Sequence, residues 1–182
     1  VGSEMCIRDR VILVGGGHAH ALFLRKWAMH SIPGVQISLI SPSPEATYTG
    51  MLPGFLAGHY SKEEIVIDLV KLCRFSGARF IMGSINNIIS KDNLISIDGR
   101  CSINYDVASI DIGVTSTINN DKRFNLNTHS IRPLGSFVDR WTEFKQQISR
   151  KKIVPKIVVI GGGIGAVEVA LATVSYTHLT LP

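Results

Sequence analysis

Residues 11–24 read VILVGGGHAHALFL, and this stretch decides the fold. Four apolar residues lead into three glycines and then into apolar residues at helical spacing. The order predicts a buried strand, a glycine-rich turn and a helix, an arrangement that holds the phosphates of a nucleotide at the helix N-terminus. In the pattern G-x-G-x-x-G, Gly15 and Gly17 take the first two positions and His20 takes the third.

The imidazole of His20 stands where a glycine normally lets the helix pack closely on the strand. We therefore expect the helix to lie slightly further from the strand, or the ring to point outward. His18 and His20 are two positions apart and do not share a helical face, so we expect no metal site there.

The neighbouring residues complete a strand–helix–strand unit. We expect a strand over 10–14, a helix over 19–30, a turn at Pro33-Gly34 and a second strand over 35–41. The helix is indicated by four apolar residues at its spacing: Ala19, Leu22, Phe23 and Trp27.

A second glycine-rich stretch, PKIVVIGGGIGAVEVALA at 155–172, predicts another strand, turn and helix. Gly161 and Gly163 take the first two glycine positions, and Ala166 is the permitted variant of the third. Gly161 follows Gly15 by 146 positions, which is too far for two halves of one sheet that meet at adjacent strands. The spacing favours a second nucleotide-binding domain inserted into an unfinished first one.

Between the two turns, residues 41–60 are rich in Pro and Gly but too apolar for a solvated loop. We expect this segment to pack on a flat surface or to line a pocket. Its apolar residues are Tyr48, Met51, Leu52, Phe55 and Leu56.

The remaining patterns predict a helix over 68–75, a pair of strands or a strand and a turn within 78–90, a hairpin that turns at Asp98-Gly99 and a buried strand leading into 111–113. Residues 115–135 are typical of a polar connection. Residues 136–150 predict an amphipathic helix with Phe137, Trp141, Phe144 and Ile148 on one face.

The composition narrows the classes of function. The chain has 182 residues, of which 45% are hydrophobic and 18% charged, so it can bury one ordinary core. Its net charge is +5, but the basic residues are scattered without interleaved aromatics, so nucleic acid is not an expected partner. Cys6, Cys73 and Cys101 lack C-x-x-C spacing, which disfavours a zinc site or redox dithiol and suits a reducing compartment. No apolar run reaches the roughly 20 residues of a membrane span.

Together these stretches resemble the FAD-dependent pyridine nucleotide–disulfide oxidoreductase superfamily. Within it, the chain is similar to NADH-dehydrogenase-like flavoproteins often fused ahead of selenide, water dikinase. The segment TGMLPGFLAGHY is the most specific, and GGGHxH is this subgroup's own form of the first turn. The likeness covers essentially all of 10–172 and is carried by VILVGGGHAH (11–20), LISPSPEATYTGMLPGFLAGHY (39–60), IDLVKLCRFSGARFI (67–81), YDVASIDIG (105–113), RPLGSFVDRW (132–141) and IVVIGGGIGAVEVALA (157–172).

The resemblance implies a truncated α/β flavoprotein with two dinucleotide-binding domains. Residues 11–153 would be a partial Rossmann-like FAD-binding domain with its connection, and 154–173 the start of an inserted NAD(P)H-binding domain. Residues 1–10 and 174–182 do not continue the neighbouring patterns, and we interpret them as non-native adapter sequence, ordinary disordered tails being the alternative. We expect such a fragment to be poorly stable and inactive.

The resemblance also implies roles for the residues at matching positions. FAD would meet Gly15, Gly17, His18 and Ala19 at its pyrophosphate, Ser41 and Pro42 at its ribose, Gly50, Met51 and Leu52 at its isoalloxazine ring, and Ser84 and Ile85 at its adenine. Asp111 and Gly113 would close the FAD site, and Gly161, Gly163, Ile164 and Glu168 would begin the NAD(P)H site.

Two features depart from the family pattern. Ser41 and Pro42 stand where many relatives carry an acidic residue on the ribose, which leaves the Ser41 hydroxyl as the bonding group. The redox-active cysteine pair is missing, so we do not expect dithiol–disulfide chemistry, and no catalytic residue is indicated.

Some of these residues also have plainer interpretations. Asp111 could cap a strand end, and Glu168 could simply favour a helix N-terminus by its charge. We expect Cys73 on an apolar helix face. His59 and Tyr60 are expected to end their loop as satisfied polar groups, with proton donation near a flavin as the alternative.

The resulting hypothesis is an enzyme in which NAD(P)H passes a hydride to FAD, and FAD passes electrons to a small-molecule acceptor such as a quinone or a selenium or sulfur species. The alternatives are a non-catalytic flavin- or dinucleotide-binding module and a single-cofactor dehydrogenase that uses only the first turn. The resemblance implies a fused or associated selenide, water dikinase. We expect a cytoplasmic protein whose basic charge suits peripheral contact with the inner face of the membrane.

Overall fold

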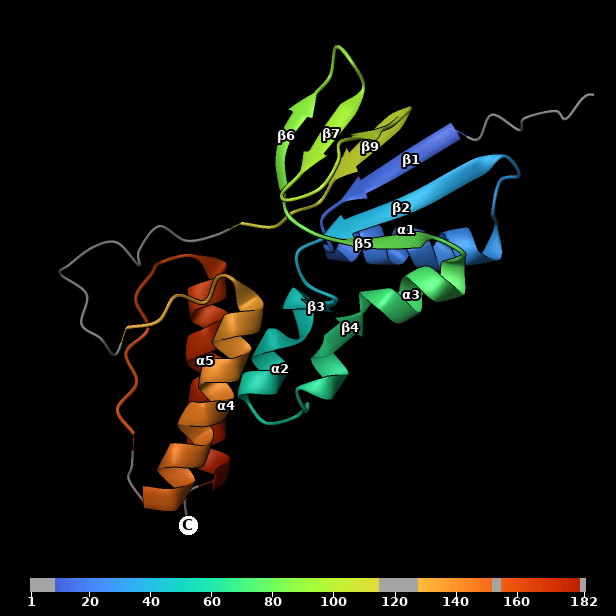
Figure 1. Ribbon diagram of the computed structural model, residues 1–182. Coiled ribbons are helices and arrows are strands. Elements are labelled where there is room, and N and C mark those ends of the chain that lie inside the picture. The colour runs from blue at the N-terminus through green and yellow to red at the C-terminus, as the bar shows by residue number, and fades with distance from the viewer. Residues whose placement is uncertain (1–8, 115–127, 152–154, 181–182) are drawn as a thin grey trace, which may run out of the picture. The chain divides into compact units, whose positions relative to one another are not determined.

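The computed structural model describes residues 9–114, 128–151 and 155–180. The chain divides into two compact units, residues 1–46 with 67–113 and residues 47–66 with 114–182 (Figure 1). Of the predicted polar connection, residues 115–127 lie outside the described residues.

The first unit begins with the predicted strand–helix–strand motif. β1 (Asp9–Val14) leads through the glycine turn into α1 (His18–Met29), and β2 (Val35–Ser41) runs parallel to β1. Gly34 closes the turn before β2 with a φ of 83°, a conformation that glycine adopts without strain. All three elements lie where the sequence predicts them.

Two further strands extend this pair. β5 (Arg79–Met82) and β9 (Val107–Ile110) complete a parallel sheet of order β5-β2-β1-β9, so the carboxyl ends of all four strands meet at one edge. The prediction that the last strand is buried is wrong, because the side chains of Val107 and Ile110 are 57% and 59% exposed. Among the described residues β9 pairs only with β1, which makes it an edge strand.

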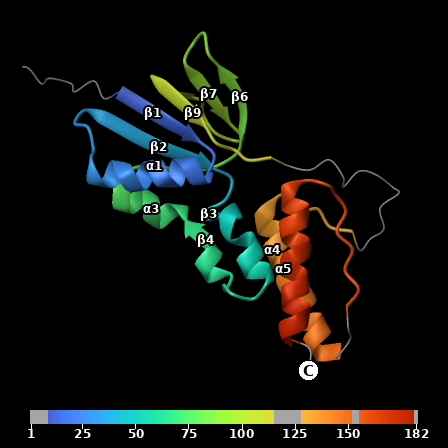
Figure 2. The same cartoon turned by 180° about the vertical axis from the view of Figure 1, so that it is seen from behind.

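Two helices cover one face of the sheet (Figures 1 and 2). α3 (Leu69–Ser76) confirms the helix predicted at 68–75; the Asp68 carboxylate caps it by accepting a 2.8 Å hydrogen bond from the Lys71 N–H. Against the sheet residues Leu13, Ile37 and Leu39, the helices pack Leu24 of α1 with Leu69 and Cys73 of α3.

The apolar spacing that indicated α1 does not mark its buried face. Leu22 is 61% exposed, whereas His20, Ala21 and Leu24 are buried. The segment carries apolar residues around most of its circumference, so the contacts of the turn, rather than the spacing, select the inner face.

A three-stranded antiparallel sheet covers the other face. It consists of β6 (Ile85–Ile89), β7 (Leu94–Ile97) and β8 (Ile103–Asn104), which confirms the strands predicted within 78–90 and the hairpin. Gly99 lies in the hairpin turn with a φ of 66°. The two sheets share a buried cluster formed by Ile12, Val14, Ile40, Ile81, Ile95 and Ile97.

The apolar segment 41–60 contains a helix that the sequence analysis does not predict. β3 (Glu45–Thr47) pairs with β4 (Val66–Asp68), and between them lie two 3-10 turns, η1 (Thr49–Met51) and η2 (Glu63–Ile65), and α2 (Leu52–Leu56). α2 buries Leu52, Phe55 and Leu56, which confirms that this segment packs rather than remaining solvated.

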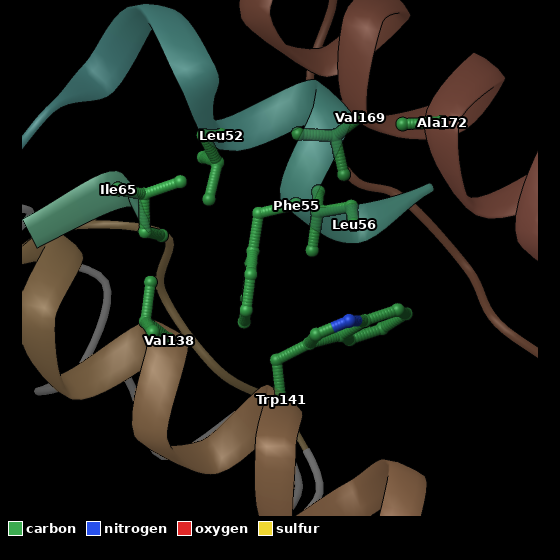
Figure 3. Packing of buried hydrophobic residues seen from close by; sticks show 8 residues of the cluster. All are labelled: Leu52, Phe55, Leu56, Ile65, Val138, Trp141, Val169 and Ala172. Atoms are coloured by element: carbon green, nitrogen blue, oxygen red, sulfur yellow. The ribbon is translucent and has the colours of Figure 1, made fainter. Parts of the chain in front are cut away.

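The core of the second unit joins α2 to two long helices, α4 (Leu134–Lys151) and α5 (Ile164–Thr180). In Figure 3, Phe55 of α2 lies against Val138 and Trp141 of α4. The predicted aromatic face of α4 is confirmed, since the Trp141 ring stacks on Phe137 at 6.5 Å and meets Phe144 at 5.6 Å between ring centroids.

The strand predicted just before the second glycine turn is not formed. Residues 155–160 belong to no strand, and the side chains of Val158 and Ile160 are 82% and 64% exposed. A strand needs a neighbour for its N–H and C=O groups, and no described strand pairs with this segment.

Candidate functional site

The first glycine turn joins the carboxyl end of β1 to α1. The Gly15 N–H donates a 2.8 Å hydrogen bond to the carbonyl of Ile40 on the neighbouring strand. Gly15 has a φ of 95°, and a Cβ there would collide with the backbone of Asp111 and Ile112. Only glycine fits this position, as expected for the first residue of a nucleotide-binding turn.

The His20 ring points inward, so the outward ring, one of the two outcomes we expected for it, is wrong. His20 is only 4% exposed; its Nδ1 lies 2.8 Å from the Gly15 carbonyl oxygen and its Nε2 lies 2.9 Å from the Ser109 hydroxyl. Because a carbonyl only accepts, Nδ1 carries the proton in the neutral ring and Nε2 accepts from Ser109. At the position where the motif usually has glycine, the His20 ring thus links the turn to β9.

Asp111 follows β9 and holds the turn from the other side. Its backbone N–H donates to the carbonyl of Val14 at 2.8 Å, and its backbone carbonyl accepts from the Gly17 N–H at 3.1 Å. Its carboxylate accepts from the N–H groups of Ala19 at 3.0 Å and His20 at 3.3 Å. A Cβ on Gly17 would run into this carboxylate.

The carboxylate of Asp111 therefore lies at the N-terminus of α1. The N-cap of that helix is Gly17, which has no side chain to cap it, and the first turn of α1 contains no acidic residue. Free N–H groups and the positive end of the helix dipole attract an anion at this place. Here the anion comes from the chain itself.

The other predicted residues of the first unit gather at the same edge of the sheet. Ser41 ends β2, is 4% exposed, and accepts a 2.9 Å hydrogen bond at its carbonyl from the Gly83 N–H after β5. Carboxyl ends of parallel strands are where open α/β sheets bind ligands. The predicted residues at this edge are Gly15, Gly17, His18, Ala19, Ser41, Pro42, Ser84, Ile85, Asp111 and Gly113.

The remaining predicted residues belong to the second unit. Gly50 and Met51 lie in η1, and the side chain of Leu52 is buried in the core that Figure 3 shows. The second glycine turn is open: a Cβ on Gly163 would meet no atom within 4 Å. There Gly161 has a φ of 141°, Ile164 begins α5, and Glu168 is exposed in its second turn.

Ser109, the partner of His20, was not among the site residues predicted from the sequence. The signal available was a polar residue inside the strand sequence VASI, two positions before Asp111. In the part of the chain that the structure describes, we find no group of three or more residues suited to hold a metal ion. None of its helices is sufficiently long and apolar to cross a membrane.

No family model and no curated protein matches the sequence, but solved structures share its fold. The sulfide:quinone oxidoreductase of Aquifex aeolicus is 21% identical, with a TM-score of 0.60, over 78% of this chain and 32% of that chain. The NADH:rubredoxin oxidoreductase of Clostridium acetobutylicum is 19% identical, with a TM-score of 0.63, over 93% of this chain and 42% of that chain.

A water-forming NADH oxidase of Lactobacillus brevis, solved with NADH bound, is 18% identical, with a TM-score of 0.60, over 92% of this chain and 37% of that chain. The chain thus spans less than half the length of each of these three proteins. The likeness confirms the predicted α/β, Rossmann-like fold.

Proposed function

We propose that the full-length protein is an FAD-dependent oxidoreductase in which NAD(P)H passes a hydride to FAD, and FAD passes electrons to an acceptor such as a quinone. One observation carries the proposal: two N–H groups in the first turn of α1, those of Ala19 and His20, already bind a carboxylate, that of Asp111. N–H groups that donate to a carboxylate can also donate to the phosphates of a dinucleotide. The similar structures are oxidoreductases, two of which are named for NADH.

The residues at the sheet edge fit the diphosphate part of FAD. A side chain at Gly15 would strike the backbone of Asp111 and Ile112, and one at Gly17 would strike the Asp111 carboxylate, so glycine is needed at both positions of the turn. The N–H groups of Ala19 and His20 would donate to the pyrophosphate once the Asp111 carboxylate moves aside. The Ser41 hydroxyl, which accepts only a long 3.4 Å hydrogen bond from the Ser43 N–H, would bond the ribose.

The other contacts follow from the sequence resemblance. FAD would supply the transfer of electrons between hydride donor and acceptor. We propose Pro42 beside the ribose, Ser84 and Ile85 at the adenine, His18 at the pyrophosphate, Gly113 beside Asp111, Gly50, Met51 and Leu52 at the isoalloxazine ring, and Gly161, Gly163, Ile164 and Glu168 at the NAD(P)H site.

The acceptor and the partners are also proposals. The three similar structures are named for different acceptors, a quinone and rubredoxin among them, so the fold alone does not select one. We propose a quinone or another small molecule, a cytoplasmic location with peripheral contact at the membrane, and a fused or associated selenide, water dikinase.

Anaerobic titration tests the proposal. The full-length protein, loaded with FAD, is mixed with NADH and separately with NADPH while visible flavin absorbance is followed. We expect bleaching with at least one nucleotide and reoxidation by an added quinone. Gly17→Ala should fail to retain flavin, whereas Gly135→Ala should retain it, because a Cβ at Gly135 meets only an ordinary contact at 3.9 Å. If flavin is bound but neither nucleotide bleaches it, the enzyme proposal is wrong and the protein is a non-catalytic flavin-binding module.

A further inference from the structure

In the sheet that α1 and α3 cover on one side (Figure 1), the opposite face changes from apolar to basic residues along its strands. Toward the carboxyl ends it carries buried residues such as Val14 and Ile40. Toward the amino ends the same face carries Arg10, Ser38 and Arg79, because alternate residues of a strand share a face. In the parallel register Ser38 lies opposite Arg79 of β5 on one side and Ile12 of β1 on the other.

This basic end of the face borders two adjoining cavities. One has a volume of about 250 Å³ and is lined by Arg10, Ile12, Gln36, Ser38, Arg79, Ile81 and Ile103. The other, of about 400 Å³, is lined by Arg79, Ile81, Ile97, Arg100, Cys101, Ser102 and Ile103. Arg79, Ile81 and Ile103 belong to both, so the cavities share a wall. The larger cavity lies within the range of about 300–1,000 Å³ that is usual for sites of small organic molecules, and the smaller one lies just below it.

The charge of these cavities is uncompensated. Arg10, Arg79 and Arg100 line them, and neither lining contains an Asp or Glu. Among the described residues none of these three guanidinium groups forms a salt bridge. The carboxylate of Asp106 accepts a 2.6 Å hydrogen bond from the Arg10 backbone N–H and does not line either cavity.

Ser38 adds a polar group that lacks a partner. Its side chain lines the smaller cavity, and the residue is only 7% exposed. Within the described part of the chain its hydroxyl makes no hydrogen bond. Because the hydroxyl is not sealed from solvent, it is available to bond a ligand that enters the cavity.

We propose that this cavity pair binds a small organic phosphate monoester. A monoester carries close to two negative charges and three acceptor oxygens. These match the guanidinium groups of Arg79 and Arg100 and the Ser38 hydroxyl. The isoleucines of the shared wall would contact the organic group. The site lies at the amino end of β1, about 16 Å of strand from Gly15, so it is separate from the glycine turn and does not depend on the proposed function.

Calorimetric titration of the 182-residue chain with phenyl phosphate tests the proposal. We expect one saturable site, with binding weakened at least about tenfold by Arg79→Gln and by Arg100→Gln. Arg100 is exposed in the loop between β7 and β8, so its variant does not disturb the sheet. Arg25→Gln, an exposed arginine on α1, is the matched control and should bind as the parent does.

Four outcomes would overturn the proposal. The first is the lack of saturable binding, and the second is unchanged binding in both arginine variants. The third is benzoate, which has the ring but a single charge, binding as tightly as phenyl phosphate. The fourth is loss of phenyl phosphate binding in a Gly17→Ala chain of unchanged melting temperature, which would place the ligand at the first glycine turn instead. The FAD site proposed at the first glycine turn is tested separately, by measuring whether Arg79→Gln still retains FAD.

Discussion

The carboxylate of Asp111 accepts a 3.0 Å hydrogen bond from the backbone N–H of Ala19, 92 positions earlier in the chain. This contact fastens the end of β9 to the start of α1. It also fills, with a negative charge, the place that the proposed pyrophosphate would take. Asp111 therefore fastens the turn in the chain as it stands and would oppose the entry of the proposed cofactor.

Replacing this charge should strengthen cofactor binding. Asp111→Asn keeps a carbonyl acceptor of the same shape but removes a like charge beside the pyrophosphate, worth on the order of 1 kcal/mol or more. We expect the dissociation constant for FAD to fall about tenfold, measured by flavin fluorescence titration. Asp106→Asn, at the opposite end of β9, is the control and should leave it unchanged. Weaker FAD binding by Asp111→Asn would show that the carboxylate itself bonds the cofactor.

The His20 ring should be a large contributor to the stability of the first unit. His20→Ala removes two buried hydrogen bonds and opens a cavity, so we expect the free energy of unfolding to fall by about 2–4 kcal/mol. Ser109→Ala removes only one of the bonds and should cost about 1 kcal/mol. Urea unfolding of both variants and of the double variant measures the coupling. Strictly additive effects would contradict the hydrogen bond between the two side chains.

The β1–α1–β2 motif could be predicted because its signals are local. Each strand is a short apolar run, and the glycines at 15–17 and 34 mark the turns between elements. The gathering of Gly15, Ser41 and Asp111 also follows from sequence once the strands are taken as parallel, since their carboxyl ends share an edge.

The features that were missed depend on partners distant in sequence. The inward His20 ring requires Ser109, which lies on another strand. The exposed β9 is set by sheet order, and the unformed strand at 155–160 lacks a described neighbour. Short apolar runs such as those at 107–110 and 155–160 predict buried strands. Whether a neighbouring strand or helix covers them depends on the order of the strands in the sheet.

Two valines of the second unit test the account of the unformed strand. Val138 is 1% exposed in the helical core, whereas Val158 is 82% exposed. Threonine keeps the shape of valine but has a hydroxyl in place of one methyl group, and burying that hydroxyl without a hydrogen-bond partner costs about 1–3 kcal/mol. In the 182-residue chain, Val138→Thr should therefore lower the free energy of unfolding by that amount, and Val158→Thr should change it by less than about 0.5 kcal/mol. Equal losses in urea unfolding would mean that Val158 is buried.

The thiol of Cys73 should be protected by the packing of α3 on the sheet. Cys73 is 1% exposed, and burial raises its pKa from 9.0 to about 11, whereas Cys101 is exposed. At pH 8 the thiolate fraction of Cys73 is then about 100-fold below that of an ordinary thiol. With Cys6 replaced by serine, an aromatic disulfide reagent should label Cys101 in the folded chain and Cys73 only after urea is added.

The same raised pKa makes stability depend on pH. The folded chain holds the Cys73 proton more tightly than the unfolded chain, so this contribution is fully present below pH 9.0 and is lost as pH rises toward about 11. Urea unfolding at a series of pH values should show that fall, and Cys73→Ala should flatten it relative to the parent. If Cys73 labels as fast as Cys101 at pH 8, or if the fall persists in Cys73→Ala, the thiol is not held neutral in the core.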